Sequence, residues 1–149
     1  MTYDALRRGR VSIPGGAYHV VLTTEGRLPL FSDFSLARML VREMRQVEEA
    51  GLLASLAWVV MPDHLHWLFV LGDGQELGAL MGHFKGRTAH AINAVCKTTG
   101  KVWQRGYYDH AVRQEEALPD IARYIVANPL RSRLVARIGD YPFWDVVWL

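Results

Sequence analysis

The chain has 149 residues, of which half are apolar and 21% are charged, a composition typical of a folded globular protein. No apolar run approaches the roughly 20 residues that cross a bilayer, and the N-terminus lacks the apolar centre of a secretory signal, so we expect a cytoplasmic protein without a membrane anchor. The single cysteine, Cys96, excludes an internal disulfide and a cysteine-rich zinc site. We expect one domain over residues 1–149, with a basic arm over about 1–16 and an apolar tail over about 141–149.

The positive charge is carried almost entirely by arginine. The formal net charge is only +2, from 17 basic and 15 acidic residues, but 14 of the basic residues are arginines. The planar guanidinium binds phosphate through two hydrogen bonds and stacks on bases, so this bias suits a nucleic acid partner. Arginine-rich codon usage explains the same bias equally well, and composition alone leaves both explanations open.

The hydrophobic periodicity predicts strands and helices separated by glycine and proline. In chain order, the expected elements are a strand at 18–24, a helix at 35–50, strands at 53–61 and 64–71, a helix at 77–96, a strand within 102–113, and helices at 118–127 and 129–138. This order predicts an α+β fold of the ferredoxin-like, split βαβ kind (βαββαβ), an antiparallel sheet with helices on one face and a C-terminal helical addition. Such a fold supports many functions and indicates none by itself.

The sharpest chemical feature is His64-Leu65-His66 within the second strand of the central hairpin. Alternate residues of a strand point to the same face, so both imidazoles are expected to project together. Two convergent neutral histidines form half of a divalent-metal site. The alternative is a polar pair on the solvent face of the hairpin. The spacing of the other histidines does not select any of them as a further ligand: His19, His83, His90 and His110.

Tyr124 lies on the predicted helix after the last strand, in one stripe with Asp120 and Asn128. A tyrosine between a carboxylate and an amide can face a polar site, where its phenolic oxygen can act as a nucleophile. The alternative is that Tyr124 packs at the edge of the core and Asn128 caps the helix that Pro129 opens.

Three blocks of sequence together resemble a known family. They are residues 60–68 (VMPDHLHWL), 102–110 (VWQRGYYDH) and 124–131 (YIVANPLR). In content, order and spacing they resemble the single-tyrosine transposases of the His-hydrophobic-His class, and within it the REP-associated tyrosine transposases of bacteria. The resemblance extends from about residue 18 to the end of the chain.

The resemblance implies a transposase or endonuclease that cuts and rejoins single-stranded, hairpin-forming DNA. It implies that Tyr124 is the nucleophile, that His64 and His66 bind a metal ion and that Asn128 completes the metal site, where related transposases carry glutamine. Either Mg²⁺ or Mn²⁺ would serve, and the product would be a 5′-phosphotyrosine. The resemblance also favours a monomer, although a homodimer stays open because dimeric relatives place the tyrosine of one subunit beside the histidines of the other.

Candidate DNA contacts are basic residues in the arm, on the long helix and near the resembling blocks. They are Arg7, Arg8, Arg10, Lys85, Arg87, Arg105 and Arg131. For each of them the alternative is a solvated surface charge. Asp63 and Asp109 are candidates for orienting the histidines.

Two other functions compete with strand transfer. A non-catalytic ferredoxin-like module would bind hairpin DNA or RNA without cutting it, and Tyr124→Phe would then change nothing. A metal hydrolase that activates water would cut DNA without a covalent intermediate. The apolar tail at 141–149 either packs on the body of the protein or covers the site.

Overall fold

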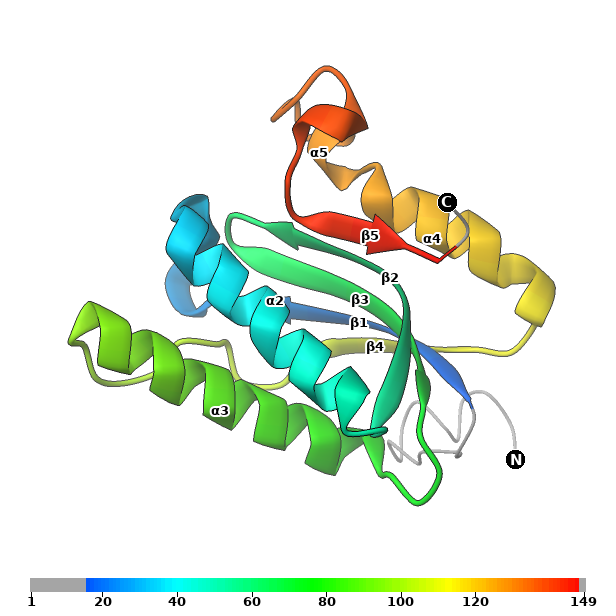
Figure 1. The fold of residues 1–149 in the computed structure, drawn as a ribbon, viewed down its shortest axis with the longest axis horizontal. Helices are drawn as coiled ribbons and strands as arrows, with labels where there is room; N and C mark the ends of the chain where they lie inside the picture. The colour runs from blue at the N-terminus through cyan, green and yellow to red at the C-terminus, as the bar shows by residue number, and fades with distance from the viewer. Residues whose placement is uncertain (1–15, 148–149) are drawn as a thin grey trace.

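The computed structural model describes residues 16–147, which form one five-stranded antiparallel sheet flanked by helices (Figure 1). The strands are β1 (Ala17–Thr23), β2 (Leu53–Met61), β3 (His64–Leu71), β4 (Tyr108–Val112) and β5 (Trp144–Val146). They lie in the order β4-β1-β3-β2-β5. The first four strands have the ferredoxin-like arrangement that the sequence predicts, and β5 extends the sheet beside β2.

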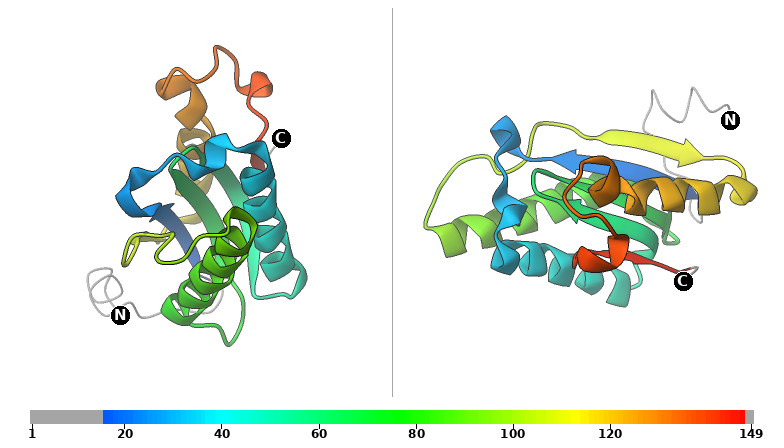
Figure 2. Two further views of the ribbon diagram at one scale, coloured as in Figure 1. Left: turned by 90° about the vertical axis from the view of Figure 1, so that its left-hand side faces the viewer. Right: turned by 90° about the horizontal axis from the view of Figure 1, so that it is seen from above.

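The helices divide between the two faces of the sheet (Figure 2). The helices α2 (Phe34–Glu49) and α3 (Leu77–Cys96) cover one face, and α4 (Leu118–Val126) crosses the other, followed by the short α5 (Asn128–Arg131). The carboxylate of Asp33 accepts a hydrogen bond from Leu36 N and caps α2, and Glu76 caps α3 in the same way. These caps satisfy backbone N–H groups that the first turn of a helix leaves without partners.

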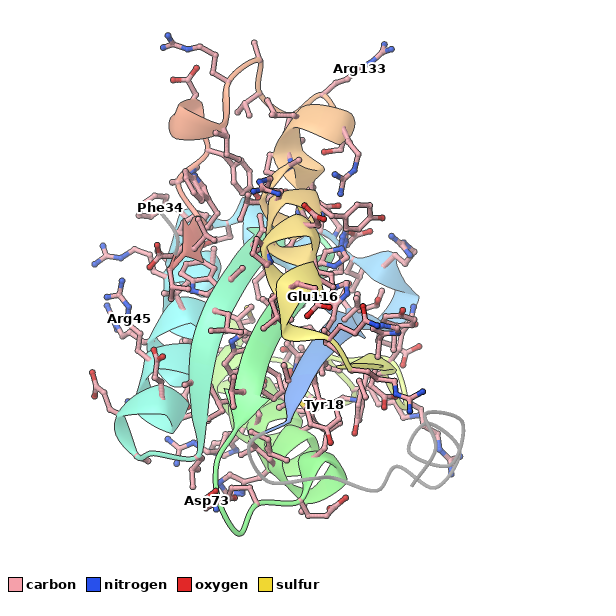
Figure 3. All side chains as sticks on the ribbon, turned by 90° about the vertical axis from the view of Figure 1, so that its right-hand side faces the viewer. Tyr18, Phe34, Arg45, Asp73, Glu116 and Arg133 are labelled. Carbon is pink, nitrogen blue, oxygen red and sulfur yellow. The ribbon has the colours of Figure 1, made fainter. Side chains whose placement is uncertain are left out.

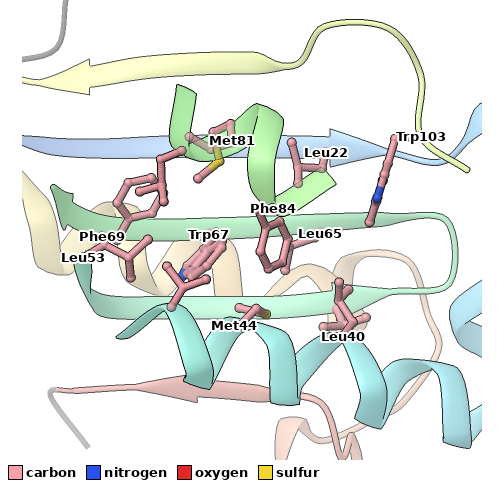
Figure 4. Close-up of a cluster of buried hydrophobic side chains, with 14 of the residues drawn as sticks. Leu22, Leu40, Met44, Leu53, Leu65, Trp67, Phe69, Met81, Phe84 and Trp103 are labelled. Carbon is pink, nitrogen blue, oxygen red and sulfur yellow. The ribbon is translucent and has the colours of Figure 1, made fainter. Parts of the chain in front are cut away.

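The central strand β3 separates two hydrophobic clusters. Leu65, Trp67 and Phe69 point toward α2 and α3 and belong to the main core (Figure 4). Leu68 points the other way, into a smaller cluster that it forms with residues of β2 and α4. The alternation of side chains along β3 therefore assigns His64 and His66 to the face that α4 crosses.

Most of the predicted elements are confirmed, but the last predicted helix is wrong. The ranges 53–61, 64–71 and 77–96 agree with β2, β3 and α3 residue by residue. The helix expected at 129–138 is only α5, which ends at Arg131. Arg133 takes a left-handed φ of 61°, and Leu134 N returns to donate to Pro129 O, so the chain turns there instead of continuing as a helix.

The C-terminal addition contains a strand as well as helices. Trp144 pairs with Val59 and Val146 with Ala57, and the Tyr141 hydroxyl donates to Val60 O. Burial raises the pKa of Tyr141 to about 12. The tail, as far as Val147, therefore packs on the body of the protein at the β2 edge of the sheet. Within residues 16–147, no helix combines the length and apolar character of a membrane span.

Candidate active site

His64 and His66 project from the same face of β3, as the alternation predicts. Their ring centroids lie 5.0 Å apart and the rings meet edge to face. His66 is buried, and His64 is partly exposed at the start of the strand. The central position of β3 gives both rings a rigid base, because the strand is paired with β1 on one side and β2 on the other.

Asp63 orients His64 from the turn between β2 and β3. Its Oδ1 atom lies 2.7 Å from His64 Nδ1, and its Oδ2 atom accepts a hydrogen bond from Arg27 Nε at 3.0 Å. Burial would raise the pKa of Asp63, but its hydrogen bond with His64 and the charges of His64 and Arg27 hold that pKa below the usual value. An ionised Asp63 accepts a hydrogen bond from the Nδ1–H group of His64, and the Nε2 lone pair of His64 is then left for a ligand.

His19 makes the corresponding contact with His66. His19 Nε2 lies 3.0 Å from His66 Nδ1, and the two rings stack with centroids 5.3 Å apart. Burial, with the charge of His110, lowers the pKa of His19 to about 4. Burial, with the charges of His64, His19 and Arg131, lowers the pKa of His66 to about 3. Both rings are therefore neutral at physiological pH, which is the form of imidazole that binds metal ions.

A cavity of about 490 Å³ lies between this histidine face and α4. It is lined by residues of β1, β3, β4 and α4, namely His19, Val21, His66, Tyr108, His110, Asp120, Ile121 and Tyr124. The structure thus brings Tyr124 and His66 to one cavity within a single chain. Its lining among the described residues includes neither His64 nor Asn128.

Arg131 holds the tyrosine from the following helix. Its guanidinium lies over the Tyr124 ring, 4.0 Å from the centroid, and its Nη2 atom donates to Tyr124 O at 2.6 Å. Tyr124 is nevertheless 56% exposed, so its hydroxyl is accessible from solvent. The guanidinium places a positive charge beside Tyr124, which lines the cavity, and such a charge attracts phosphate.

Asn128 is held at the junction of α4 and α5. Its amide nitrogen donates to Ile125 O at 2.8 Å, with a longer contact to Tyr124 O. Because both partners are carbonyl oxygens, the nitrogen must face them and Oδ1 points elsewhere. Asn128 therefore does not cap α5 with its side chain, and its carbonyl oxygen is the atom that a ligand could use.

Some of the basic side chains predicted to bind DNA already make hydrogen bonds within the protein. Lys85 Nζ donates to Gln104 O and Gly106 O, both at 2.8 Å, and Arg87 contacts Glu43 and Gln46. Arg105 is exposed, and Arg131 contacts Tyr124. The expected contacts of the arm lie outside the described residues: Arg7, Arg8 and Arg10.

The sequence could not select His19, Tyr108 or His110 for the cavity. Strand register places them there: Val21 lies opposite both His66 and Tyr108, and His19 lies opposite His110. Register depends on pairing between strands far apart in the chain, which spacing within one strand does not reveal. Asp109 lies opposite Val20, a residue of the main core, and so belongs to the other face of the sheet.

Comparison with known proteins agrees with the resemblance seen in the sequence. A family model described as "Transposase IS200 like" matches residues 12–128. The chain is 28% identical over 88 residues to the REP-associated tyrosine transposase of Escherichia coli K12, which covers 58% of this chain and 50% of that relative. The chain spans about half the length of the curated relatives it matches.

A solved structure extends the similarity to the fold. It is described as a REP-associated tyrosine transposase bound to a REP hairpin, and it has a TM-score of 0.75 and 25% sequence identity. The superposition covers 89% of this chain and 77% of the other. The predicted ferredoxin-like fold and the predicted resemblance to REP-associated tyrosine transposases are both confirmed.

Proposed function

The chain belongs to the IS200-like transposase family, and from this premise we propose that it cuts and rejoins single-stranded hairpin DNA with Tyr124 as the nucleophile. The observation that carries the proposal is the cavity that Tyr124 shares with His66 in one chain. The hairpin as substrate is supported by the similar solved structure, which is described as bound to a REP hairpin.

In each direction the reaction exchanges one oxygen at phosphorus for another. The Tyr124 oxygen attacks the scissile phosphate, an O–P bond to tyrosine forms, and the bond from phosphorus to the 3′ oxygen breaks. The tyrosine loses its proton and the departing 3′ oxygen gains one. Attack by a 3′-hydroxyl on the 5′-phosphotyrosine then reverses the exchange and joins DNA without an external energy source.

Arg131 and the cavity walls give this chemistry its local support. The guanidinium above the Tyr124 ring fixes the direction of the side chain and adds positive charge where the phosphate must lie. The aromatic and histidine side chains opposite it exclude part of the solvent from the attacking oxygen.

His64 and His66 fit a divalent metal ion in their donor chemistry. When Asp63 and His19 act as hydrogen-bond acceptors for the two Nδ1 atoms, each ring presents the lone pair of Nε2 to a ligand. Among the described residues, no three His, Cys, Asp or Glu side chains are grouped to hold a metal, so an oxygen ligand must come from another source. We assign this role to Asn128 Oδ1, together with phosphate or water. When bound, Mg²⁺ or Mn²⁺ would polarise the scissile phosphate, and the two histidines favour Mn²⁺ over the oxygen-preferring Mg²⁺.

We further propose that the monomer is sufficient for cleavage. The histidine face and the tyrosine meet in one cavity of one chain, so no second subunit is required to supply the nucleophile. A mixture of Tyr124→Phe and His66→Ala proteins tests this directly. Two subunits that exchange tyrosines would restore cleavage in the mixture, and independent monomers would not.

The decisive experiment looks for a protein–DNA adduct that survives denaturation. The protein is incubated with hairpin oligonucleotides taken from repeats beside its own gene, with Mn²⁺ or Mg²⁺. We expect an adduct that a chelator or Tyr124→Phe abolishes. Tyr108→Phe is the matched control, because Tyr108 lines the same cavity from β4 and is 48% exposed.

Other outcomes would replace the proposal. An adduct that persists in Tyr124→Phe and disappears in Tyr108→Phe would show that Tyr108, and not Tyr124, is the nucleophile. Cleavage without any adduct would indicate water activation at the histidines. Tight hairpin binding without cleavage in either metal would indicate a non-catalytic binding module.

A further inference from the structure

We propose that the groove between α2 and β5 binds a second stretch of single-stranded DNA, at the opposite edge of the sheet from β4. The inference rests on the proposed function for the class of its ligand. The groove has a volume of about 300 Å³ and is lined by α2, by Trp58 of β2 and by the segment that leads into β5.

Three arginines form one side of the groove. Arg38, Arg42 and Arg45 have the spacing of a single helix face, and all three are exposed. In the part of the chain that the structure describes, none of them forms an ion pair, in contrast to Arg27 and Arg87.

Two acidic residues of α2, Glu43 and Glu48, make contacts elsewhere in the protein. Glu43 accepts a hydrogen bond from Arg87 of α3 at 3.1 Å. Glu48 accepts one from Ser55 N at 2.8 Å. Asp145, the carboxylate in the lining of the 300 Å³ hollow, accepts a hydrogen bond from Val146 N. Asp145 keeps its charge in this hydrogen bond, but the three guanidinium groups outnumber it, so this lining has a net positive charge that can bind phosphates.

Aromatic rings stand beside the arginines. Phe34 is 56% exposed, and the Arg38 guanidinium lies 5.8 Å from its ring centroid. Trp58 is half-buried and forms part of the groove lining. An exposed ring on a soluble protein is a site on which a base can stack, and rings interleaved with basic groups are characteristic of single-strand binding.

The aromatic lining of the groove favours a single strand over a duplex. A second hollow of about 120 Å³ shares Arg45, Trp58 and Asp145 with the first, so the groove continues along β5. The lining of this second hollow includes Glu48, so the arginine side of the groove ends at Arg45. Bases that are free of pairing can reach the rings, whereas the paired bases of a duplex cannot.

This surface is separate from the Tyr124 cavity. The two have no lining residue in common, and α2 lies on the face of the sheet opposite α4. Figure 3 shows Phe34 and Arg45 together on the side of the molecule away from Tyr18. The arginines can therefore be replaced without disturbing the residues proposed for cleavage.

The test measures binding of a fluorescent single-stranded thymidine tract and of a blunt duplex of equal length, over a range of salt concentrations. The variant R38Q/R42Q removes two groove charges. The matched variant K97Q/K101Q removes two exposed lysines, one directly after the C-terminal end of α3 and one in the loop that follows it. We expect R38Q/R42Q to weaken binding of the thymidine tract by about tenfold and to reduce the slope of log K against log salt by about 1.4. K97Q/K101Q should leave both quantities close to wild type.

A second variant tests stacking without a change in charge. Phe34→Leu keeps an apolar side chain at an exposed position, so it does not threaten the fold. This variant should weaken binding of the thymidine tract by about five- to a hundredfold and leave the slope of log K against log salt unchanged.

The proposal is overturned if wild type binds the duplex as tightly as the single strand, or if R38Q/R42Q and K97Q/K101Q behave alike. Its failure is distinguishable from failure of the proposed function. If wild type forms the Tyr124 adduct and R38Q/R42Q binds the thymidine tract as tightly as wild type, only this inference is overturned. Groove binding that persists in a protein without any adduct would overturn only the proposed chemistry.

Discussion

The Nε2 atom of His19 lies 3.0 Å from the Nδ1 atom of His66, so the protonation of one ring determines the role of the other. With both rings neutral, a hydrogen bond between these two nitrogens requires one of them to carry a proton and the other to accept it. If His66 is the donor, its Nε2 atom has a lone pair for a metal ion; if His19 is the donor, the His66 Nε2 atom is protonated and binds none. Metal binding by His66 therefore requires His19 to act as the hydrogen-bond acceptor.

Replacing His19 by leucine should weaken Mn²⁺ binding by about 10- to 100-fold, because His66 loses the acceptor that selects its metal-binding tautomer. Titration of Mn²⁺ followed by electron paramagnetic resonance measures this without DNA or turnover. His19→Gln restores an acceptor oxygen and should recover part of the affinity. Equal affinities in wild type and His19→Leu would contradict a positioning role.

Asp63 should support His64 in the same manner. Asp63→Ala is expected to lower Mn²⁺ affinity by about 10- to 100-fold, because the Nδ1 proton of His64 loses its carboxylate. Arg27→Gln is the matched control, since it removes the other partner of the same carboxylate and leaves the contact with His64 in place. Isothermal titration calorimetry of the two variants separates the effects. A comparable loss in both would mean that the turn as a whole, and not the His64 contact, controls the affinity.

The buried histidines should make the fold sensitive to acid. The pKa values of His19 and His66 are lowered to about 4 and about 3, whereas each returns to about 6.5 in the unfolded chain. At pH values between the folded and unfolded pKa, the unfolded chain binds more protons than the folded protein. The free energy of unfolding therefore decreases as the pH falls below about 6.5.

Urea unfolding at about pH 7 and about pH 5, in the presence of a chelator, measures this dependence. The double variant H19Q/H66N should show a smaller difference between the two conditions. His83→Gln, at an exposed position on α3, should retain the full difference. A double variant as acid-sensitive as wild type would assign the effect to other groups.

Lys85 should matter for stability, because its ammonium group joins α3 to the loop before β4. Lys85→Met leaves Gln104 O and Gly106 O without their donor and should cost about 1–3 kcal/mol in the free energy of unfolding. Lys97→Met, at the exposed end of the same helix, should cost much less. Urea unfolding compares them. A variant Lys85→Met as stable as wild type, with weaker DNA binding, would return Lys85 to the DNA contacts predicted from sequence.

The elements that could be predicted from sequence are those whose pattern is local. Strand β3 and helix α3 follow from alternation and helical periodicity within their own residues, and so does the shared face of His64 and His66. β5 was not predicted as a strand, because it has only three residues and exists through its pairing with β2. The contact between His19 and His66 depends in the same way on the register of β1 against β3.

Charge was the least informative signal for individual residues. The sequence analysis names Lys85 and Arg87 as DNA contacts and does not name Arg38. In the structure Lys85 and Arg87 donate hydrogen bonds to protein acceptors, whereas Arg38 lies over the Phe34 ring and forms no ion pair among the described residues. The difference depends on the partners that tertiary packing provides, which are the loop before β4 for Lys85 and α2 for Arg87.

The pairing of β5 with β2 also makes the two edges of the sheet unequal. β2 has nine residues, and β5 pairs with part of its outer edge. The Glu48 carboxylate accepts a hydrogen bond from Ser55 N on the same strand. Both contacts occupy backbone groups that would otherwise face solvent. At the other edge β4 has only five residues, and no described strand pairs with its outer side. Exposed edges are where sheets of separate molecules join and aggregate. The tail thus protects the longer edge of the sheet at β2. The edge left for strand addition by another molecule is the short one at β4, beside the Tyr124 cavity.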